Sequence, residues 1–268
     1  MRPRPGIVLA LFAACAFLCA ACAGPAATSC VGESPGGVLW ICGGGTLAPD
    51  VLAGFVSDAG GASARLVLIP GASRSADDAD ALERQLARWR ARGIAEPMVL
   101  HTRSRAEADD EAFVAPLRQA TAVWFGGGDQ KRLAEVFAGT RVERELHALL
   151  ARGGVIGGSS AGAAIQSKVM IAGGNPEPQI GTGLDLLPGA IIDQHFRARQ
   201  REARLVAAVR AHPECTGYGI DEGTALVVRG GVARVLGAGG VTVVQARGDD
   251  EPGLRFVPAG ETLELDAR

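Results

Sequence analysis

The stretch Gly157-Gly158-Ser159-Ser160-Ala161-Gly162 directly follows the apolar run Gly154-Val155-Ile156. It contains the pattern Gly-x-Ser-x-Gly, centred on Ser160. A serine flanked in this way fits a sharp turn from a strand into a helix, where only glycine tolerates the crowding. The turn exposes the hydroxyl, and the helix directs backbone N–H groups at the atom under attack. The stretch therefore predicts a nucleophile at Ser160; a small-residue loop that packs a helix close to a sheet is the alternative.

Apolar runs alternate with helical segments on the N-terminal side of this stretch. Strands are expected at residues 38–42, 65–69, 97–101, 120–125 and 155–156, and helices at 77–92, 106–113, 133–137 and 142–152. Continuous apolar strands that alternate with helices are typical of a parallel sheet covered on both faces. The sequence therefore predicts an α/β fold with a mostly parallel central sheet.

The pattern changes after about residue 183. A strand at 191–196 and a helix at 197–211 are followed by short strands at 219–221, 224–229, 232–236 and 241–246, with a hairpin turn at 230–231. Ligands of open parallel sheets bind beyond the carboxyl ends of the strands. Residues 127–130, Ser160 and residues 193–195 all follow such ends, which would allow them to converge on one site.

Composition favours one large domain without nucleic-acid chemistry. The chain has 268 residues, 47% of them hydrophobic, which is enough for a single core, here assigned to residues 31–268. The formal net charge of -2 gives no basic surplus that would indicate a nucleic-acid partner.

The N-terminus has the features of an export signal. Arg2 and Arg4 precede an uncharged apolar stretch at 7–21, which is too short for a comfortable membrane span. Residues 21–23 fit a cleavage site, whereas residues 19–22 form an imperfect lipobox that would make Cys22 the lipidated first residue. We therefore predict that residues 1–30 are a signal peptide or lipoprotein leader with a mobile N-terminus. The mature protein would be periplasmic, extracellular or lipid-anchored in the envelope.

Three of the six cysteines remain outside this leader: Cys30, Cys42 and Cys215. An oxidising compartment allows one disulfide among them, with Cys30 as a candidate partner. The cysteine spacing does not resemble a zinc site.

Residues 43–48, Gly-Gly-Gly-Thr-Leu-Ala, satisfy the dinucleotide-binding pattern G-x-G-x-x-A after a strand. Such a site also needs an acidic residue at the end of the next strand. That strand ends in Ile69-Pro70-Gly71, so a tight strand-to-loop turn is the better interpretation and no cofactor is predicted.

A nucleophilic serine needs a base, and the chain has four histidines, His101, His147, His195 and His212. His195 follows a buried strand and is preceded by Asp193 and Gln194, a polar trio that is costly to bury unless it faces a polar site. It is therefore favoured over His101, which also closes a strand. Within hydrogen-bond reach of Ser160, it would take the hydroxyl proton and return it to the leaving amine.

An acid would orient the histidine and stabilise its imidazolium form. The candidates are Glu177, in a loop just after the serine helix, and Asp185, Asp221 and Glu222. The oxyanion needs two donors, for which we predict the N–H of Ala161 and a glycine of 126–128, with Gly128 as the choice.

Arginines follow the histidine at Arg197, Arg199, Arg201 and Arg204. Guanidinium groups bind carboxylates in bidentate fashion, so a run next to the presumed cleft points to an anionic or peptide-carboxylate substrate. A solvated helix face is the alternative.

The motifs at residues 127–130, 158–164, 170–174, 183–187, 193–196 and 219–222 together resemble the cyanophycinase family of serine peptidases, relatives of the bacterial aspartyl dipeptidases. The resemblance runs from about residue 38 to 246. It implies a flavodoxin-like fold of the class I glutamine amidotransferase type, with short C-terminal hairpins.

The resemblance also implies a site and a reaction. The family's nucleophile falls on Ser160, its histidine on His195 and its glutamate near Glu177. Its substrate pocket falls on Gln130, Asp193, Gln194, Arg199, Arg201 and Arg204. The family cleaves cyanophycin, a poly-aspartate with arginine on each β-carboxyl, into β-aspartyl-arginine dipeptides, without a metal or organic cofactor.

The expected partner is therefore a peptide, cyanophycin or a related β-aspartyl peptide, cleaved by a secreted or lipid-anchored serine exopeptidase. An aspartyl dipeptidase of the same superfamily and a non-catalytic envelope lipoprotein are the alternatives. A homodimer is one oligomeric state that the sequence allows.

Overall fold

Apolar strands form the centre of the computed structural model, which describes residues 36–248 and 250–265. The parallel strands are β1 (Val38–Cys42), β2 (Leu66–Ile69), β3 (Met98–Val99), β4 (Ala122–Phe125) and β5 (Val155–Ser159). Antiparallel strands β10 (Thr224–Arg229), β11 (Val232–Gly237) and β14 (Thr262–Glu264) extend the sheet beyond β1. The resulting 8-stranded sheet has the order β14-β11-β10-β1-β5-β4-β2-β3. The predicted α/β class with C-terminal hairpins is confirmed.

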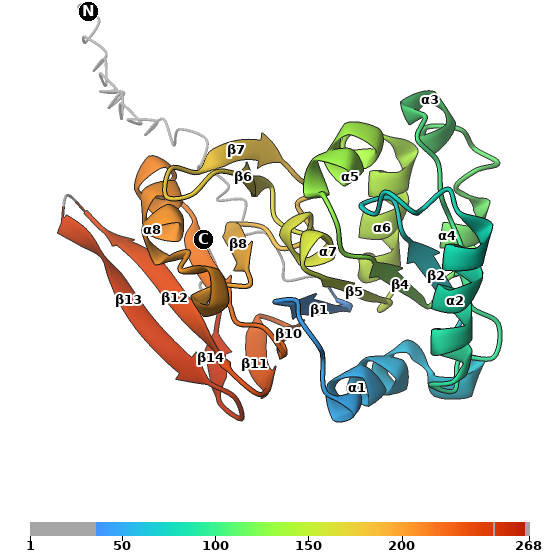
Figure 1. Cartoon of the computed structure of the whole chain (residues 1–268), viewed down its shortest axis with the longest axis horizontal. Coiled ribbons are helices and arrows are strands. Elements are labelled where there is room, and N and C mark those ends of the chain that lie inside the picture. The colour runs from blue at the N-terminus through green and yellow to red at the C-terminus, as the bar shows by residue number, and fades with distance from the viewer. Residues whose placement is uncertain (1–35, 249, 266–268) are drawn as a thin grey trace, which may run out of the picture. The chain divides into compact units, whose positions relative to one another are not determined.

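Helices cover both faces of this sheet (Figure 1). One face carries α1 (Pro49–Ala59) and α2 (Ala79–Arg90), and the other carries α5 (Gln130–Phe137), α6 (Arg141–Ala151) and α7 (Ala161–Ala164); the remaining short helices are α3 (Arg105–Ala108) and α4 (Ala115–Gln119). Successive side chains of a strand point to opposite faces. The ring centroid of Trp124 therefore lies 4.8 Å from that of Phe55 of α1, while Phe125 packs in the core on the side of α5.

A second sheet, separate from the central one, carries the histidine segment. Its strands are β8 (Ala190–Gln194), β9 (Thr216–Ile220), β12 (Gly240–Arg247) and β13 (Asp250–Pro258), in the order β13-β12-β9-β8. Strand β8 runs parallel to β9, and α8 (Glu202–Ala211) packs Leu205 and Val209 against Gly217. A two-stranded sheet of β6 (Val169–Gly173) and β7 (Gln179–Thr182) completes the strands.

The helix predicted at 197–211 is interrupted. A 3₁₀ turn at Arg197–Arg199 is followed by Gln200 in the left-handed region, with φ of 50°, and α8 begins only at Glu202. The interruption has a consequence for the site, because it turns Arg201 and Arg204 back toward the end of β8.

Backbone hydrogen bonds at the carboxyl end of β1 join the two sheets. The N–H of Ser160 donates to Cys42 O at 3.0 Å, and the N–H of His195 donates to Gly43 O at 2.7 Å. The N–H of Gly223 donates to Gly44 O at 2.8 Å. The loop after β1 therefore brings the ends of β5, β8 and β9 to one place.

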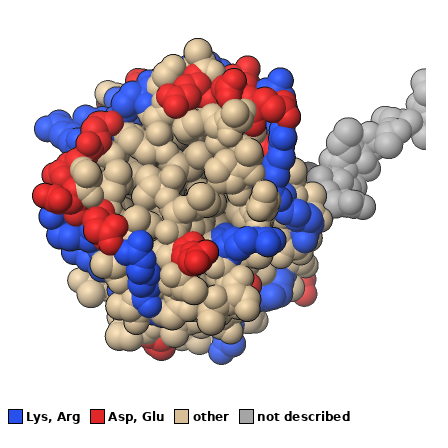
Figure 2. Space-filling view, turned by 90° about the vertical axis from the view of Figure 1, so that its right-hand side faces the viewer, with Lys and Arg blue, Asp and Glu red and all other residues tan. Residues whose placement is uncertain are grey.

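The surface around α2, α3 and α4 carries charges of both signs. Figure 2 shows this side, which lies at the right in Figure 1, with Lys and Arg interspersed among Asp and Glu. Ion pairs such as Arg118 with Glu111, at 2.8 Å, and Arg144 with Asp109, at 3.0 Å, account for part of the pattern. Positive and negative side chains therefore lie close together on this face.

All described residues belong to one compact unit. No helix within residues 36–248 and 250–265 is long and apolar enough to cross a membrane. The leader predicted at 1–30, with Cys22 and Cys30, lies outside the described residues.

Candidate active site

Ser160 occupies a sharp turn between β5 and α7, as its sequence context predicts. Its backbone has φ of 57° and ψ of -112°, a strained conformation for a residue with a side chain. A Cβ on Gly158 would lie 2.2 Å from Gly162 O, and a Cβ on Gly162 would lie 2.4 Å from Phe125 O. The flanking glycines are therefore needed for the turn to close.

His195 lies against this serine. Its Nε2 is 2.8 Å from Ser160 Oγ, and its side chain is 10% exposed. Gly44 packs directly on the imidazole, because a Cβ there would lie 2.4 Å from Cε1 of His195. The glycine-rich loop after β1 thus supports the histidine, which agrees with a tight turn better than with a dinucleotide site.

Gly44 gives a direct test of this support. Gly44→Ala is expected to lower kcat by about two orders of magnitude. The new methyl group would push the imidazole of His195 away from its position beside Ser160 Oγ, and small misplacements of reacting groups are costly. Steady-state kinetics on a peptide substrate measures the change. Gly60→Ala is the matched control: Gly60 also has a positive φ, of 109°, but a Cβ there meets only Ala64, at 3.8 Å. Equal kcat values for the two variants would contradict the assigned role of Gly44.

Glu222 is the acid that lies against the histidine. Its Oε1 hydrogen-bonds Nδ1 of His195, and its side chain is 44% exposed. A carboxylate at this position assigns the ring proton to Nδ1, which donates to Glu222 and leaves Nε2 to accept from the Ser160 hydroxyl. Ser160, His195 and Glu222 therefore form a continuous hydrogen-bonded chain.

The choice of Glu177 as the third member does not agree with this geometry. Glu177 is exposed, in the turn between β6 and β7, and no hydrogen bond joins it to His195 within the described ranges. Of the alternatives, Asp185 lies 3.4 Å from Lys168 Nζ and Asp221 accepts from Arg197 Nε at 2.7 Å. Glu222 is one of the alternative acids that the sequence offers. Like His195, it comes just after a buried strand, and that position is the sequence signal by which it could be found.

The other histidines have partners away from Ser160. His101 Nε2 lies 2.8 Å from an Asp77 carboxylate oxygen, and His147 Nε2 lies 2.9 Å from Leu184 O. His212 Nδ1 lies 3.2 Å from Glu214. The preference for His195 over His101 therefore agrees with the distances.

The expected oxyanion donors border the serine. Ala161 is the first residue of α7, so its N–H has no acceptor within the helix. In the loop after β4, a Cβ on Gly127 would lie 3.6 Å from Ser160 Cβ, whereas Gly128, with φ of 145°, packs against Ala72. Of the two glycines, Gly127 is thus the one next to Ser160.

Asp193, only 1% exposed, is the centre of a buried ionic cluster. Arg204 Nε donates to its Oδ2 at 2.9 Å, and Arg201 Nη1 donates to its Oδ1 at 3.3 Å. Arg204 also donates to Gly174 O at 2.8 Å. Burial lowers the pKa of Arg201, and the charge of Asp193 opposes that shift. Two guanidinium groups share one carboxylate, which leaves the cluster net positive.

The remaining predicted pocket residues differ in their placement. Gln194 is buried; its Oε1 lies 3.4 Å from Ser160 Oγ and its backbone oxygen accepts from Arg201, so it joins the cluster to Ser160. Arg199 is exposed on the 3₁₀ turn after His195. Gln130 is also buried, but its amide donates to Ile171 O at 2.8 Å and so holds α5 to β6.

Cys42 lies next to this site, but its thiol is buried and unreactive. Its side chain is fully buried at the end of β1, and burial raises the pKa of its thiol to about 12. The thiolate is the reactive form of cysteine, so burial makes this thiol a poor nucleophile. The predicted disulfide through Cys30 lies outside the described residues and stays a prediction.

Alkylation tests this burial. In reducing buffer at pH 8, Cys42 of the native protein is expected to resist iodoacetamide, and unfolding in guanidinium should make it react. Peptide mass spectrometry reads the two states separately. Comparable labelling rates before and after unfolding would contradict a buried, protonated thiol.

No group of three metal-ligating side chains occurs in the part of the chain that the structure describes. The site that does exist consists of a serine, a histidine, a glutamate and an arginine-rich pocket.

Comparison with known proteins agrees with this constellation. Residues 39–236 match the family model of Peptidase family S51. The chain belongs to this family. It is 38% identical over 224 residues to a cyanophycinase of Synechococcus elongatus, covering 80% of this chain and 69% of that protein. It is 35% identical over 225 residues to a cyanophycinase of Geminocystis herdmanii (strain PCC 6308), covering 81% and 82%. This S51 chain is therefore a cyanophycinase-like peptidase, as the motifs indicated.

Solved structures confirm the fold of this S51 peptidase. A crystal structure of a peptidase from an acI-B1 Actinobacterium superposes with a TM-score of 0.69 at 23% identity, covering 87% of this chain and 99% of that one. A putative peptidase E protein from Listeria monocytogenes EGD-e gives a TM-score of 0.52 at 18% identity, covering 75% and 98%.

Proposed function

We propose that this S51 peptidase is a serine exopeptidase that hydrolyses cyanophycin, or a related β-aspartyl peptide, to β-aspartyl-arginine dipeptides. The observation that carries the proposal is the hydrogen-bonded chain from Ser160 through His195 to Glu222, 2.8 Å long at its first link. The similarity to cyanophycinases supports the substrate class.

The reaction follows from the positions of these groups. Ser160 Oγ attacks the aspartyl carbonyl carbon as Nε2 of His195 takes the hydroxyl proton. The developing oxyanion would be met by backbone N–H groups at Ala161 and the loop at Gly127. The C–N bond then breaks, and Nε2 gives its proton to the leaving amine. A water deprotonated by the same Nε2 cleaves the resulting ester and restores the serine hydroxyl.

Glu222 acts through the histidine. Its carboxylate accepts the Nδ1 proton of His195, holds the ring with Nε2 toward Ser160, and stabilises the imidazolium that forms when Nε2 is protonated. Its partial exposure leaves it in contact with solvent, so the stabilisation is smaller than that of a buried acid.

The arginine cluster supplies substrate selection. Each cyanophycin unit carries an arginine joined through its α-amino group, which leaves a free carboxylate on every side chain. The net positive group of Asp193, Arg201 and Arg204 would attract that carboxylate close to the serine. Exposed Arg199 adds positive charge at the same edge.

Digestion of purified cyanophycin tests the proposal. Chromatography with mass spectrometry should show β-aspartyl-arginine from the first time points, without an accumulating ladder of longer fragments. A ladder would indicate endopeptidase action. Cleavage of short aspartyl peptides alone would favour an aspartyl dipeptidase, and a folded protein inactive on both would favour the non-catalytic alternative.

We also propose that the enzyme acts outside the cytoplasm, either released by cleavage near residue 22 or anchored through a lipid on Cys22. The charged start at Arg2 and Arg4, the apolar stretch at 7–21 and the lipobox-like residues 19–22 support this. Intact mass of the mature protein from its native host distinguishes diacylated Cys22 from plain cleavage near residue 22. A mature protein that retains residues 1–21 would overturn both forms of the proposal.

A further inference from the structure

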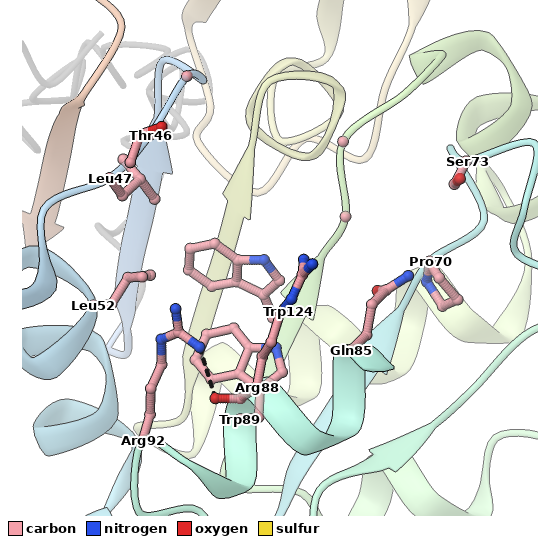
Figure 3. Close-up of a pocket in the computed structure, with 13 residues that line it drawn as sticks. Thr46, Leu47, Leu52, Pro70, Ser73, Gln85, Arg88, Trp89, Arg92 and Trp124 are labelled. Atoms are coloured by element: carbon pink, nitrogen blue, oxygen red, sulfur yellow. Dashed lines mark hydrogen bonds between the residues drawn. The ribbon is translucent and has the colours of Figure 1, made fainter. Parts of the chain in front are cut away.

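A cavity of about 480 Å³ opens beside the catalytic residues, among the loops that follow β1, β2 and β4 and the helix α2 (Figure 3). Two of its lining residues also contact the catalytic chain. Gly127 lies against Ser160, and a Cβ on Gly45 would lie 2.9 Å from Cβ of Glu222. Neither the residues around Asp193 nor Ser160, His195 and Glu222 line it, so Gly127 and Gly45 are what join the cavity to the site. A peptide held at the serine can therefore reach this cavity with a part that the Asp193 cluster does not hold.

Two arginines from α2 and its end line the cavity. Figure 3 shows the Arg88 side chain rising from α2 beside Trp124 into the space. Arg92 is held in place, because its Nη1 donates to Arg88 O at 2.6 Å and its guanidinium stacks over the Trp89 ring at 5.7 Å. The indole groups of Trp89 and Trp124 form an apolar wall beneath these charges.

Neither guanidinium is neutralised by an acid. Over residues 36–248 and 250–265, no ion pair involves Arg88 or Arg92, although Arg90 of the same helix pairs with Glu83 at 2.5 Å. Two unpaired positive charges at a concave site attract an anion. A volume of this size accommodates a dipeptide unit.

We propose that this cavity is a second substrate subsite, in which Arg88 and Arg92 bind a carboxylate of the peptide unit on the far side of the scissile bond from the unit at the Asp193 cluster. The inference rests on the proposed function. Guanidinium groups bind carboxylates through paired N–H donors, and the tryptophan wall suits the methylene groups of an arginine side chain. The enzyme would thus recognise two consecutive units, one on each side of Ser160.

Kinetics on a peptide of two β-aspartyl-arginine units tests the subsite. The double variant Arg88→Gln/Arg92→Gln is expected to raise KM about tenfold, the loss of roughly one charge-assisted hydrogen bond. Arg84→Gln is the matched control, since Arg84 is exposed on α2 and does not line the cavity. Two further peptides are compared, each with one of the two arginine carboxylates replaced by an amide. One of them should show the same rise in KM with the unaltered enzyme. The double variant should not raise the KM for that peptide any further. Equal KM values for the double variant and Arg84→Gln would overturn the proposal.

Binding without turnover separates this inference from the proposed function. Calorimetry of the peptide of two β-aspartyl-arginine units is done on full-length Ser160→Ala protein, which binds without cleaving. The Kd is expected to be about tenfold weaker when Arg88→Gln/Arg92→Gln is added than when Arg84→Gln is added. If cyanophycin is not cleaved but this dependence is found, the proposed function fails and the subsite stands. If cyanophycin is cleaved but KM and Kd are insensitive to Arg88 and Arg92, the subsite alone is wrong. Absence of measurable binding to the Ser160→Ala protein without these changes would also overturn the subsite.

Discussion

Ser160→Ala is expected to lower kcat on a β-aspartyl peptide by about four to six orders of magnitude, with a much smaller change in KM. The variant keeps the backbone of the turn but removes the oxygen that forms the acyl bond. The arginine cluster at Asp193 is untouched, so substrate should still bind. Water attack assisted by His195 and the oxyanion donors sets the residual rate.

Ser159→Ala is the matched control for this prediction. Ser159 is the last residue of β5, adjacent to Ser160, and the hydrogen bonds of His195 go to Ser160 and Glu222 instead. Its kcat should remain within the same order of magnitude as that of the unaltered enzyme. Steady-state rates of both variants, with circular dichroism to compare their folding, decide the matter. Substantial activity of Ser160→Ala would refute the assigned nucleophile.

Glu222→Gln is expected to lower kcat by roughly two to four orders of magnitude. The amide has nearly the shape of the carboxylate but no charge, and its NH₂ group can donate to Nδ1 of His195. The proton would then sit on Nε2, where it prevents the ring from accepting the Ser160 proton. Because Glu222 is 44% exposed, the effect should fall toward the lower end of this range.

Glu177→Gln separates the two candidate acids with the same chemical change. Glu177 is exposed in the β6–β7 turn, so its replacement should leave kcat within a few-fold of the unaltered enzyme. Parallel kinetics of the two variants on one substrate gives the comparison. A large loss in Glu177→Gln together with an active Glu222→Gln would restore Glu177 as the acid.

The sequence could locate Ser160 and His195 because their signals are local. Each follows a short buried strand and has characteristic neighbours in the sequence. Glycines flank the serine, and Asp193 and Gln194 precede the histidine. Parallel strands present their carboxyl ends on one side of a sheet, so the two residues are expected to converge whatever the strand order.

Glu222 could not be chosen from the sequence because its role depends on a nonlocal pairing. Strand β9 runs parallel to β8 with Ile220 opposite Gln194, which places the residues after the two strands side by side. Four acids were open in the sequence, and only this register distinguishes them. Similarity placed the acid near Glu177, where the β6–β7 turn instead exposes it to solvent.

The arginine run shows a second limit of sequence reasoning. A continuous helix from 197 to 211 would place Arg201 and Arg204 one turn apart on its surface. The left-handed Gln200 instead ends the first turn, and both arginines fold back onto buried Asp193. A single backbone conformation thus converts a surface charge pattern into a pocket, and propensity alone does not predict it.

Active-site acylation tests the central claim most directly. With β-aspartyl-arginine activated as a p-nitrophenyl ester at the aspartyl α-carboxyl, formation of the acyl-enzyme should outpace its hydrolysis. We predict a burst of nitrophenolate stoichiometric with enzyme, and a mass increase of one acyl unit on the peptide that contains Ser160. A burst of equal size from Ser160→Ala, or an acyl group on any other residue, would contradict the account.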